Sequence, residues 1–477
     1  MLNMSPERVK MPEQPIDERV KNFDEVSLGY TEAMAVEEAQ RCLNCKFEPC
    51  RHSCPVHVEI PKFINLISQG KFLEAHEIIS HSSSLPGVCG RVCPQELQCE
   101  GSCVRGRKGE AVAIGRLERF AADYYRRNNT DEITKPKQKP FKVAVIGSGP
   151  AGLSCAGVLV KYGYKTVIFE AFHEPGGVLV YGIPQFILPK EIVAGEIDAL
   201  VQMGAEIKTN TVVGEAFTLD NLLGSEGFDA VFIATGAGYP LSMGIEGENL
   251  NGVYPSSEFL TKVNAMDAQR FPEVDNPVRI GKRVAVIGGG NVAMDAARCA
   301  LRLGAEHVFI VYRRTQEEMP ARLEEIFQAK AEGIEFMFLK SPAAFKGDLD
   351  GNLVSMECVS YELGEADESG RCSPVEIKNS NHSIDIDTAI IAIGQTVSPI
   401  TRKLCSKLQT NHRGNIWVDE STNSSSVDGV FAGGDVTTGP ATVIKAMGAG
   451  RRAGEAIHRY LLKKAEEKEA EGNAGCD

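Results

Sequence analysis

The stretch Lys142-Val-Ala-Val-Ile-Gly147-Ser-Gly149-Pro-Ala-Gly152 joins an apolar strand to the start of a helix through closely spaced glycines. In this arrangement the first glycine permits a tight turn, and the second lets the backbone approach a diphosphate. The third allows the helix to pack closely on the strand, and the helix N-terminus favours negative charge. The stretch therefore predicts a strand–helix–strand unit that binds a dinucleotide.

The same pattern returns later in the chain as Arg283-Val-Ala-Val-Ile-Gly288-Gly-Gly290-Asn291-Val-Ala293. Each copy leads to a second apolar strand, and later to a third strand that ends in glycine, at Gly236 and at Gly394. Repetition of this pattern is typical of doubly wound domains with parallel sheets. The sequence therefore predicts two such α/β domains, each with its own nucleotide.

The ends of the second strands distinguish the two nucleotides. Glu170 ends the first of these strands, where a carboxylate can accept hydrogen bonds from ribose hydroxyls and would repel a 2′-phosphate. Arg313 and Arg314 end the corresponding strand of the second copy, and guanidinium groups suit a 2′-phosphate. These residues predict FAD or NAD in the first domain and NADP(H) in the second.

Eight of the chain's 14 cysteines lie in two runs, Cys42-x2-Cys45-x4-Cys50-x3-Cys54 and Cys89-x3-Cys93-x5-Cys99-x3-Cys103. Thiolates are soft anionic ligands that suit iron–sulfur clusters, and each run has about the ligand count for one cluster. Structural zinc is the alternative, since paired cysteines also form tetrahedral zinc sites. Disulfides are disfavoured because Met1–Pro15 lacks the apolar run of a secretory signal. We therefore expect a cytoplasmic protein with reduced thiols.

Length and charge narrow the possible partners. A chain of 477 residues has room for about three domains. Its formal net charge of -13 argues against a nucleic-acid or anionic-membrane surface. The most apolar stretch, Phe141–Val160, is interrupted by Gly147–Pro150, so no transmembrane segment is predicted.

Taken together, the eight cysteines, the segment Ile114–Phe120, both glycine fingerprints and Ala432-Gly-Gly-Asp435 resemble the glutamate synthase small-subunit family over nearly the whole chain. The resemblance implies an α-helical domain with two [4Fe–4S] clusters, followed by FAD- and NADPH-binding domains that are both doubly wound α/β structures. It also implies that the NADPH domain is inserted between two parts of the FAD domain. The implied ranges are 1–135 for the iron–sulfur domain, 141–245 and 385–465 for the FAD domain, and 246–384 for the NADPH domain.

The resemblance also implies roles for individual residues. One cluster would be held by Cys42, Cys45, Cys50 and Cys103, and the other by Cys54, Cys93, Cys99 and Glu118, with Cys89 left over. FAD would contact Gly147, Gly149, Gly152, Glu170, Gly177, Gly434, Asp435 and Thr442. NADP(H) would contact Gly288, Gly290, Asn291, Ala293, Arg313, Arg314 and Gly394. No catalytic side chain is expected, because the cofactors supply the redox chemistry.

One residue departs from the family pattern. The position of Ile187 is commonly basic in the family, so a cationic contact to the flavin is expected to be missing.

The function implied by the resemblance is electron transfer between NADPH, FAD, the two clusters and a partner subunit. Gly252–Asn264 and Met319–Arg322 resemble the large subunit of NADH-dependent, electron-bifurcating ferredoxin:NADP+ oxidoreductases more than they resemble proteobacterial glutamate synthase. This predicts a ferredoxin-reductase-like flavoprotein partner, with ferredoxin as a further partner. One alternative is the NADPH-oxidising small subunit of glutamate synthase, whose partner is the large subunit. Another is a zinc-stabilised nucleotide-binding scaffold without turnover.

Overall fold

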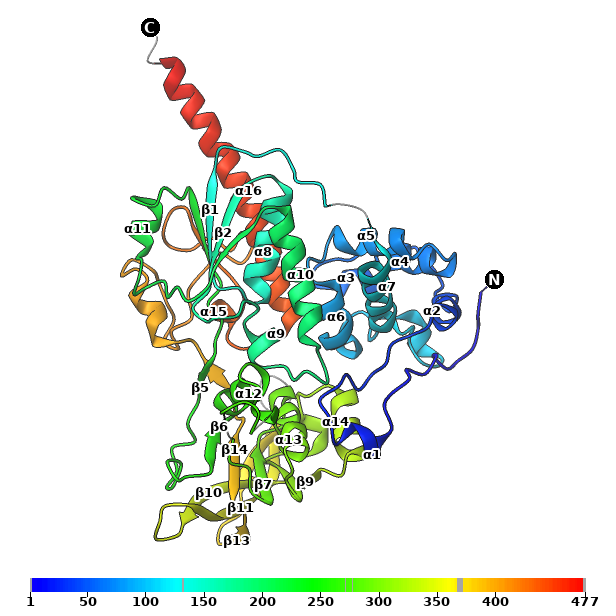
Figure 1. The fold of residues 1–477 in the computed structure, drawn as a ribbon, viewed down its shortest axis with the longest axis vertical. Helices are drawn as coiled ribbons and strands as arrows, with labels where there is room; N and C mark the ends of the chain where they lie inside the picture. The colour runs from blue at the N-terminus through cyan, green and yellow to red at the C-terminus, as the bar shows by residue number, and fades with distance from the viewer. Residues whose placement is uncertain (1, 131–132, 271, 277, 367–371, 475–477) are drawn as a thin grey trace.

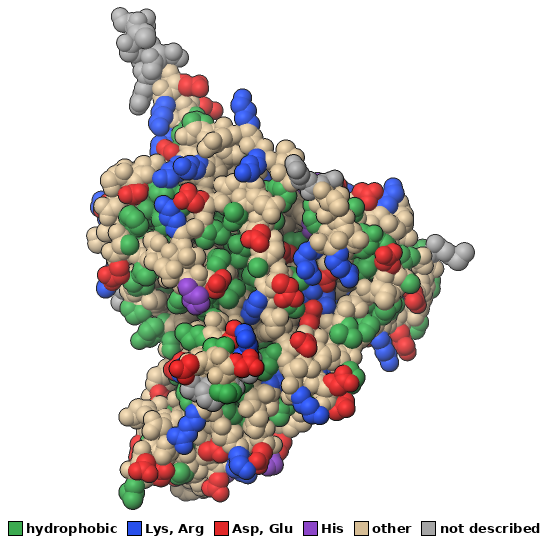
Figure 2. All heavy atoms as spheres, in the orientation of Figure 1, with side chains coloured by type: hydrophobic (Ala, Val, Ile, Leu, Met, Phe, Trp, Pro, Cys, Tyr) green, Lys and Arg blue, Asp and Glu red, His purple; other side chains and the backbone are tan. Residues whose placement is uncertain are grey.

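The chain forms three parts that meet along their edges, as the computed structural model in Figure 1 shows. The structure describes residues 2–130, 133–270, 272–276, 278–366 and 372–474. A small helical part lies at the right of the view, one α/β part at the upper left, and a second α/β part below it. On the face seen in Figure 2, charged side chains are scattered, and hydrophobic ones gather near the notch between the two α/β parts.

The N-terminal part of the chain contains seven α-helices among its described residues. They are α1 (Ile16–Arg19), α2 (Glu32–Ala39), α3 (Pro49–His52), α4 (Ile60–Ser68), α5 (Phe72–Ser80), α6 (Pro86–Val92) and α7 (Ile114–Asn128), with the short 3-10 turns η1 (Gln95–Leu97) and η2 (Val104–Arg107). Helix α1 lies against the second α/β unit, and the others form the helical part. Residues 60–80 form the two helices α4 and α5, because Gly70 between them adopts a left-handed conformation with φ +74°. Phe63, Ile67 and Ile79 on these helices are fully buried.

The first sheet is parallel throughout. It combines strands that precede the second α/β part in the sequence with one strand that follows it. Its order is β16-β4-β1-β2-β3, with β1 (Lys142–Ile146), β2 (Lys165–Phe169), β3 (Glu206–Lys208), β4 (Ala230–Ile233) and β16 (Val430–Ala432). Its helices are α8 (Pro150–Lys161), α9 (Val178–Tyr181), α10 (Lys190–Met203), α11 (Leu219–Leu223), α15 (Asp435–Thr438) and α16 (Val443–Ala474), with the turn η5 (Pro399–Lys403).

The second parallel sheet has the order β6-β14-β7-β8-β9. Its strands are β6 (Val253–Pro255), β7 (Arg283–Ile287), β8 (His307–Tyr312), β9 (Glu335–Phe338) and β14 (Thr388–Ile391), accompanied by α12 (Ser256–Asn264), α13 (Asn291–Arg302), α14 (Leu323–Ala331) and the turns η3 (Ala268–Arg270) and η4 (Gln316–Glu318). The division predicted between residues 384 and 385 is wrong in one respect. Strand β14 follows it, yet pairs with β7 and β6, so the second unit extends to Ile391.

An antiparallel sheet beside the second unit was not predicted from the sequence. It consists of β10 (Lys340–Gly347), β11 (Leu353–Ala366), β12 (Cys372–Glu376) and β13 (His382–Asp385). The chain passes between the two α/β units twice, and the two passages pair as the short antiparallel strands β5 (Tyr239–Pro240) and β15 (Gln395–Thr396). Both connections therefore run side by side.

The C-terminal helix α16 extends over 32 residues. It packs on α8, and its side chains are buried as far as Leu461, whereas Leu462 is already 46% exposed. The last turns project beyond the sheet, as Figure 1 shows in red. Among the described residues, no helix combines the length and apolar character needed to cross a membrane.

A buried carboxylate ties the N-terminal segment to the second α/β unit. Glu332, which follows α14, pairs with Arg298 at 2.7 Å, Arg302 at 2.8 Å and Arg19 of α1 at 3.0 Å. The ring of Phe186 packs against the guanidinium groups of Arg298 and Arg302 at 4.7 and 4.1 Å. Burial alone would raise the pKa of Glu332, but hydrogen bonds from Arg298 and Arg302 outweigh it and lower the pKa to about 2.

Replacing Glu332 with Gln should therefore destabilise the protein strongly. Arg298 and Arg302 would lose the charge of Glu332, whereas Arg19 keeps its pair with Glu13, and breaking a buried ion pair on one side costs about 3–5 kcal/mol. Because the folded-state pKa is depressed, the stabilisation is fully present above about pH 4.5 and is lost as the pH falls toward 2. Urea unfolding at several pH values measures this. The control is Glu306→Gln, which removes an exposed pair with Lys282; an equal loss in both variants would contradict the prediction.

Candidate functional site

The first predicted ligand set gathers around one cavity in the helical part. Cys42, Cys45, Cys50 and Cys103 all line it and are all half-buried. The remaining walls are mainly apolar and come from Ile60, Ile64, Val112 and Ile114. Four soft donors beside apolar walls are the kind of ligands and surroundings that an iron–sulfur cluster requires, and the assignment of these four cysteines to one cluster stays a prediction.

The thiols of this set influence one another electrostatically. Burial raises the pKa of Cys50 to about 12, and the neighbouring Cys42 and Cys103 add to the rise. Burial also raises the pKa of Cys42, with further contributions from Cys103 and Cys45. Thiols that repel one another's charge in this way need a cation between them to become ligands.

The second predicted set lies deeper. Cys93 and Cys99 are only 6% and 8% exposed, and Cys54 is half-buried. Burial raises the pKa of Cys54 to about 11 and that of Cys99 well above its usual range, and the Glu118 carboxylate contributes to both. Burial raises the pKa of Glu118 itself to about 8. Glu118 therefore lies close enough to Cys54 and Cys99 to influence both thiols, and its role as the fourth ligand stays a prediction.

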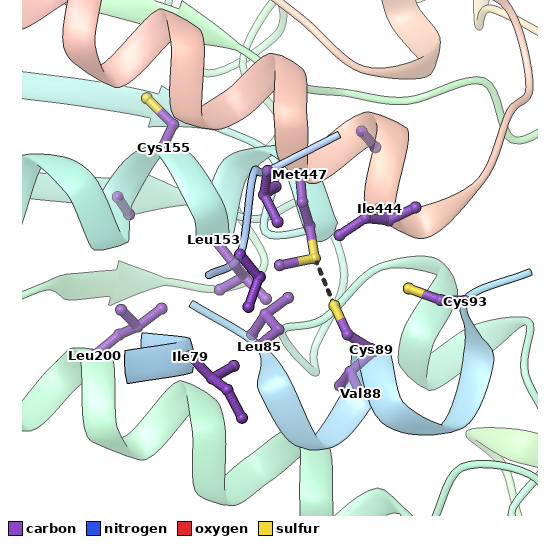
Figure 3. Close-up of a cluster of buried hydrophobic side chains, with 14 of the residues drawn as sticks. Ile79, Leu85, Val88, Cys89, Cys93, Leu153, Cys155, Leu200, Ile444 and Met447 are labelled. Carbon is purple, nitrogen blue, oxygen red and sulfur yellow. Dashed lines mark hydrogen bonds between the residues drawn. The ribbon is translucent and has the colours of Figure 1, made fainter. Parts of the chain in front are cut away.

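Cys89 is fully buried and lies beside the second set. Figure 3 shows its sulfur pointing to that of Met447 on α16, at 3.4 Å, while Cys93 ends the same helix α6. The start of α16 also lies against the loop after Cys54, because a Cβ at Gly448 would come within 2.9 Å of the Pro55 carbonyl oxygen. The second set therefore adjoins α16.

The first glycine loop has the backbone geometry of a nucleotide site. Gly147 has φ +101°, and a Cβ there would lie 2.4 Å from the Ala234 carbonyl oxygen. A Cβ at Gly152 would lie 1.9 Å from the carbonyl oxygen of Gly147, which explains the need for glycine where α8 packs on β1. A Cβ at Gly149 would meet no atom within 4 Å, so the N-terminus of α8 is open to a ligand.

The other predicted flavin residues converge on this loop from distant parts of the chain. A Cβ at Gly177 would lie 2.9 Å from the Gly149 Cα, and one at Gly434 would lie 2.8 Å from the Ala151 Cβ. Asp435 accepts a hydrogen bond from the Ala441 backbone at 3.2 Å, and burial raises its pKa to about 6. Thr442 precedes α16, and its hydroxyl accepts a hydrogen bond from the Lys445 backbone at 3.4 Å.

Glu170 is buried at the end of β2, with 5% of its surface exposed. Its carboxylate accepts hydrogen bonds from the Ser148 backbone at 3.0 Å, the Ser148 hydroxyl at 2.5 Å and the Phe172 backbone at 2.9 Å. A carboxylate has about four acceptor positions, so one is left for a ribose hydroxyl. These bonds hold Glu170 at the edge of the glycine loop.

The second glycine loop repeats this geometry. Gly288 has φ +147°, with the Ala392 carbonyl oxygen 2.3 Å from where its Cβ would lie, and Ala293 is fully buried. Gly290 faces open space, with only Pro320 within 4 Å. The Asn291 side chain accepts a hydrogen bond from the Arg322 backbone at 2.8 Å, so it also anchors the loop before α14. Gly394, with φ +125°, follows β14 and hydrogen-bonds through its carbonyl to Leu241.

The two predicted phosphate arginines have different surroundings. Arg313 is exposed at the end of β8. Arg314 is only 9% exposed, and its Nε donates a hydrogen bond to the Cys372 carbonyl at 2.7 Å. Arg313 is therefore the better placed of the two for an incoming phosphate, while Arg314 ties β8 to the antiparallel sheet.

Sequence reasoning missed Lys190, at the start of α10. Its ammonium group donates hydrogen bonds to the carbonyl oxygens of Leu179 and Ile183, which follow the predicted flavin contact Gly177, and burial lowers the pKa of Lys190 to about 8. A lysine soon after a glycine- and proline-containing segment was the available signal. Ile187 lines a different cavity, between the N-terminal segment and α14, and its predicted effect on the flavin remains a prediction.

Two sequence families match the chain. Residues 19–130 match the dihydropyrimidine dehydrogenase domain II family with its 4Fe-4S cluster, and residues 141–450 match the pyridine nucleotide-disulphide oxidoreductase family. The cysteine spacing alone left both zinc and iron–sulfur clusters possible. The first match favours iron–sulfur. The zinc scaffold without turnover is therefore wrong.

Several relatives are similar over most of the chain. The glutamate synthase [NADPH] small chain of Escherichia coli is 37% identical over 95% of this chain and 97% of its own length. The NADPH-Fe(3+) oxidoreductase subunit beta of Geobacter sulfurreducens is 37% identical over 94% of this chain and 69% of its own length. The NADP(+)-dependent formate dehydrogenase subunit beta of Moorella thermoacetica is 41% identical over 87% of this chain, which spans 60% of that subunit.

Solved structures share the arrangement of the two α/β units. FprA from Mycobacterium tuberculosis superposes with a TM-score of 0.57 at 21% identity, covering 69% of this chain and 87% of its own. Thioredoxin reductase from Lactococcus lactis superposes with a TM-score of 0.51 at 22% identity, covering 68% and 99%. Together with the two parallel sheets, these similarities confirm the predicted fold class.

The helical cysteine part and the two nucleotide-binding units thus define an NADP(H)-dependent oxidoreductase that contains FAD and an iron–sulfur cluster. The chain belongs to the glutamate synthase small-subunit family, as its sequence predicted.

Iron analysis tests the assignment of the ligands. Anaerobically prepared protein should contain about eight iron atoms per chain, since each four-iron cluster requires four ligands. Cys42→Ser and Cys103→Ser should each lose about half of the iron, because both thiols line one cavity. Cys89→Ala is the control and should keep all of it; equal iron loss from Cys89→Ala would show that the ligand sets are wrong.

Separate alanine variants distinguish the two arginines. Arg313→Ala should lower the NADPH-to-NADH ratio of kcat/KM by about 10- to 100-fold, since a charge-assisted hydrogen bond contributes about 1.5–3 kcal/mol. Arg314→Ala should mainly lower the thermal unfolding midpoint, because the carbonyl of the half-buried Cys372 loses the Arg314 donor. An unchanged ratio in Arg313→Ala would place the phosphate site elsewhere.

Proposed function

We propose that this chain carries electrons between NADPH, FAD, two [4Fe–4S] clusters and a partner subunit. The observation that supports this most directly is the order of the sites. The first glycine loop and the second thiol set both adjoin the start of α16, and α3 leads from Cys54 back to Cys50 of the first set. The half-buried first set lies nearest to solvent.

The chain's own residues have positioning roles in this proposal. Gly149 and Gly290 leave the helix N-termini open to diphosphates. Glu170 accepts hydrogen bonds from the ribose hydroxyls of FAD, and Arg313 binds the 2′-phosphate of NADPH. The conversion between two-electron and one-electron steps is supplied by the flavin when it is bound. The apolar walls around the thiol sets exclude water.

For the partner, we propose a second flavoprotein, as in an electron-bifurcating ferredoxin:NADP+ oxidoreductase. The support is the similarity of Gly252–Asn264 and Met319–Arg322 to that enzyme class. Relatives named as subunits of a formate dehydrogenase and of a glutamate synthase support the more general point that the partner decides the final reaction. The alternative partner is a glutamate synthase large subunit, favoured by the full-length similarity to the small chain.

Omitting each donor in turn tests this proposal. The chain alone should oxidise NADPH with viologen dyes and make no glutamate from glutamine and 2-oxoglutarate. With the flavoprotein partner, NADP+ reduction should require both NADH and reduced ferredoxin. Full NADP+ reduction from ferredoxin without NADH would reject bifurcation, and glutamate formation with a large amidotransferase subunit would establish the alternative.

A further inference from the structure

The surface over the first thiol set carries an exposed aromatic side chain. Phe47, in the loop between Cys45 and Pro49, is 82% exposed, and Leu43 beside it is 37% exposed. Asn44 and Glu48 flank the loop with left-handed backbone conformations, at φ 49° and 42°. Non-glycine residues adopt this conformation at a cost, and such strain concentrates at functional surfaces.

The same surface is basic although the whole chain is acidic. Residues 42–54 and 99–110, which hold the first thiol set, contain five Lys or Arg residues against three Glu, whereas the whole chain has a net charge of -13. All three carboxylates are paired: Glu48 with Arg51, and Glu100 and Glu110 with Arg8. Within the part of the chain that the structure describes, Lys46, Arg107 and Lys108 are exposed and form no ion pair.

These side chains lie close to the route that electrons would take. Cys45 and Arg105 line the cavity of the first set, and Cys103 also lines a surface groove together with Pro49 and Arg107. Cys103, a predicted cluster ligand, thus lies between the cavity and the groove. We name the residues Lys46, Phe47, Arg105, Arg107 and Lys108 the Phe47 patch.

We infer that the Phe47 patch is the docking surface for an acidic one-electron carrier protein. Unpaired cations beside the first thiol set and an exposed aromatic side chain in its loop match a partner with carboxylates and an apolar centre, since complementary charge steers association and aromatic residues anchor interfaces. At each encounter one electron crosses, so that one protein is oxidised as the other is reduced and no covalent bond changes. The inference rests on the proposed electron transfer through the thiol sets.

The test measures binding with a defined probe, the oxidised form of an acidic bacterial ferredoxin with two [4Fe–4S] clusters, immobilised on a sensor surface. The cofactor-loaded full chain should bind at low ionic strength, and added salt should weaken binding. The triple reversal Lys46→Glu, Arg107→Glu and Lys108→Glu should raise Kd at least about tenfold. Phe47→Ala should raise Kd about fivefold at low and at high salt, because apolar contacts are not screened.

The matched control is Lys378→Glu, Lys407→Glu and Arg413→Glu, which changes the net charge equally on exposed residues elsewhere. It should change Kd less than twofold. Equal weakening by both triple variants would show a general charge effect and overturn the inference, as would tighter binding of a basic probe, cytochrome c, to the native chain. If the reversal variant loses iron, the milder variant Lys46→Gln, Arg107→Gln and Lys108→Gln decides, with an expected rise in Kd of about three- to tenfold.

A kinetic measurement separates this inference from the proposed function. In stopped-flow mixing, the reduced ferredoxin should reduce the clusters more slowly in the reversal variant, by about tenfold, while the rate of flavin reduction by NADPH stays the same. NADPH-dependent viologen reduction without ferredoxin binding would leave the proposed function intact and reject the docking surface. Loss of viologen reduction in the native chain would reject the proposed function itself.

Discussion

The close packing of α16 on α8 is the constraint on which the arrangement of sites depends. A Cβ at Gly450 would lie 2.1 Å from the Ala151 carbonyl oxygen, and one at Gly454 would lie 2.8 Å from the Val158 Cβ, so only glycine allows the two helices to approach this closely. The same helix presents Gly448 to Pro55 and Met447 to Cys89. One helix therefore positions the flavin loop and the deeper thiol set relative to each other.

Polar contacts hold the second α/β unit against the helical part in a different way. Arg322 donates hydrogen bonds to the Arg91 carbonyl at 2.7 Å and to the Gln95 side chain at 3.3 Å, and the Gln95 amide in turn binds the Cys89 carbonyl at 3.2 Å. With the Glu332 cluster, these contacts join three parts of the chain. Such networks depend on direction and charge, so they fix orientation where apolar packing alone would permit sliding.

The features of the fold and site that depend on short sequence patterns could be predicted from the sequence. The glycine fingerprints predicted both strand–helix units, and the family resemblance grouped the four cysteines that line one cavity in the structure. The antiparallel sheet β10–β13 was missed because its strands are stabilised by pairing with one another, which the local sequence does not show. The boundary at residue 384 failed because β14 lies between β6 and β7, a pairing distant in sequence. Arg313 and Arg314 look equivalent in sequence, and they are distinguished by their burial and by the hydrogen bond from Arg314 to the Cys372 carbonyl.

The paired strands β5 and β15 have a mechanical consequence. Because both passages between the α/β units run together, a body attached only there could swing about a single axis. The N-terminal segment attaches the same body at a second place, through Arg19 and Asn22 to Glu332 and Arg302. Figure 1 shows α1 on the opposite side of this body from β5. With attachments on opposite sides, the second α/β unit is no longer free to rotate about β5 and β15. Such a rotation would first have to break the ion pair between Arg19 and Glu332.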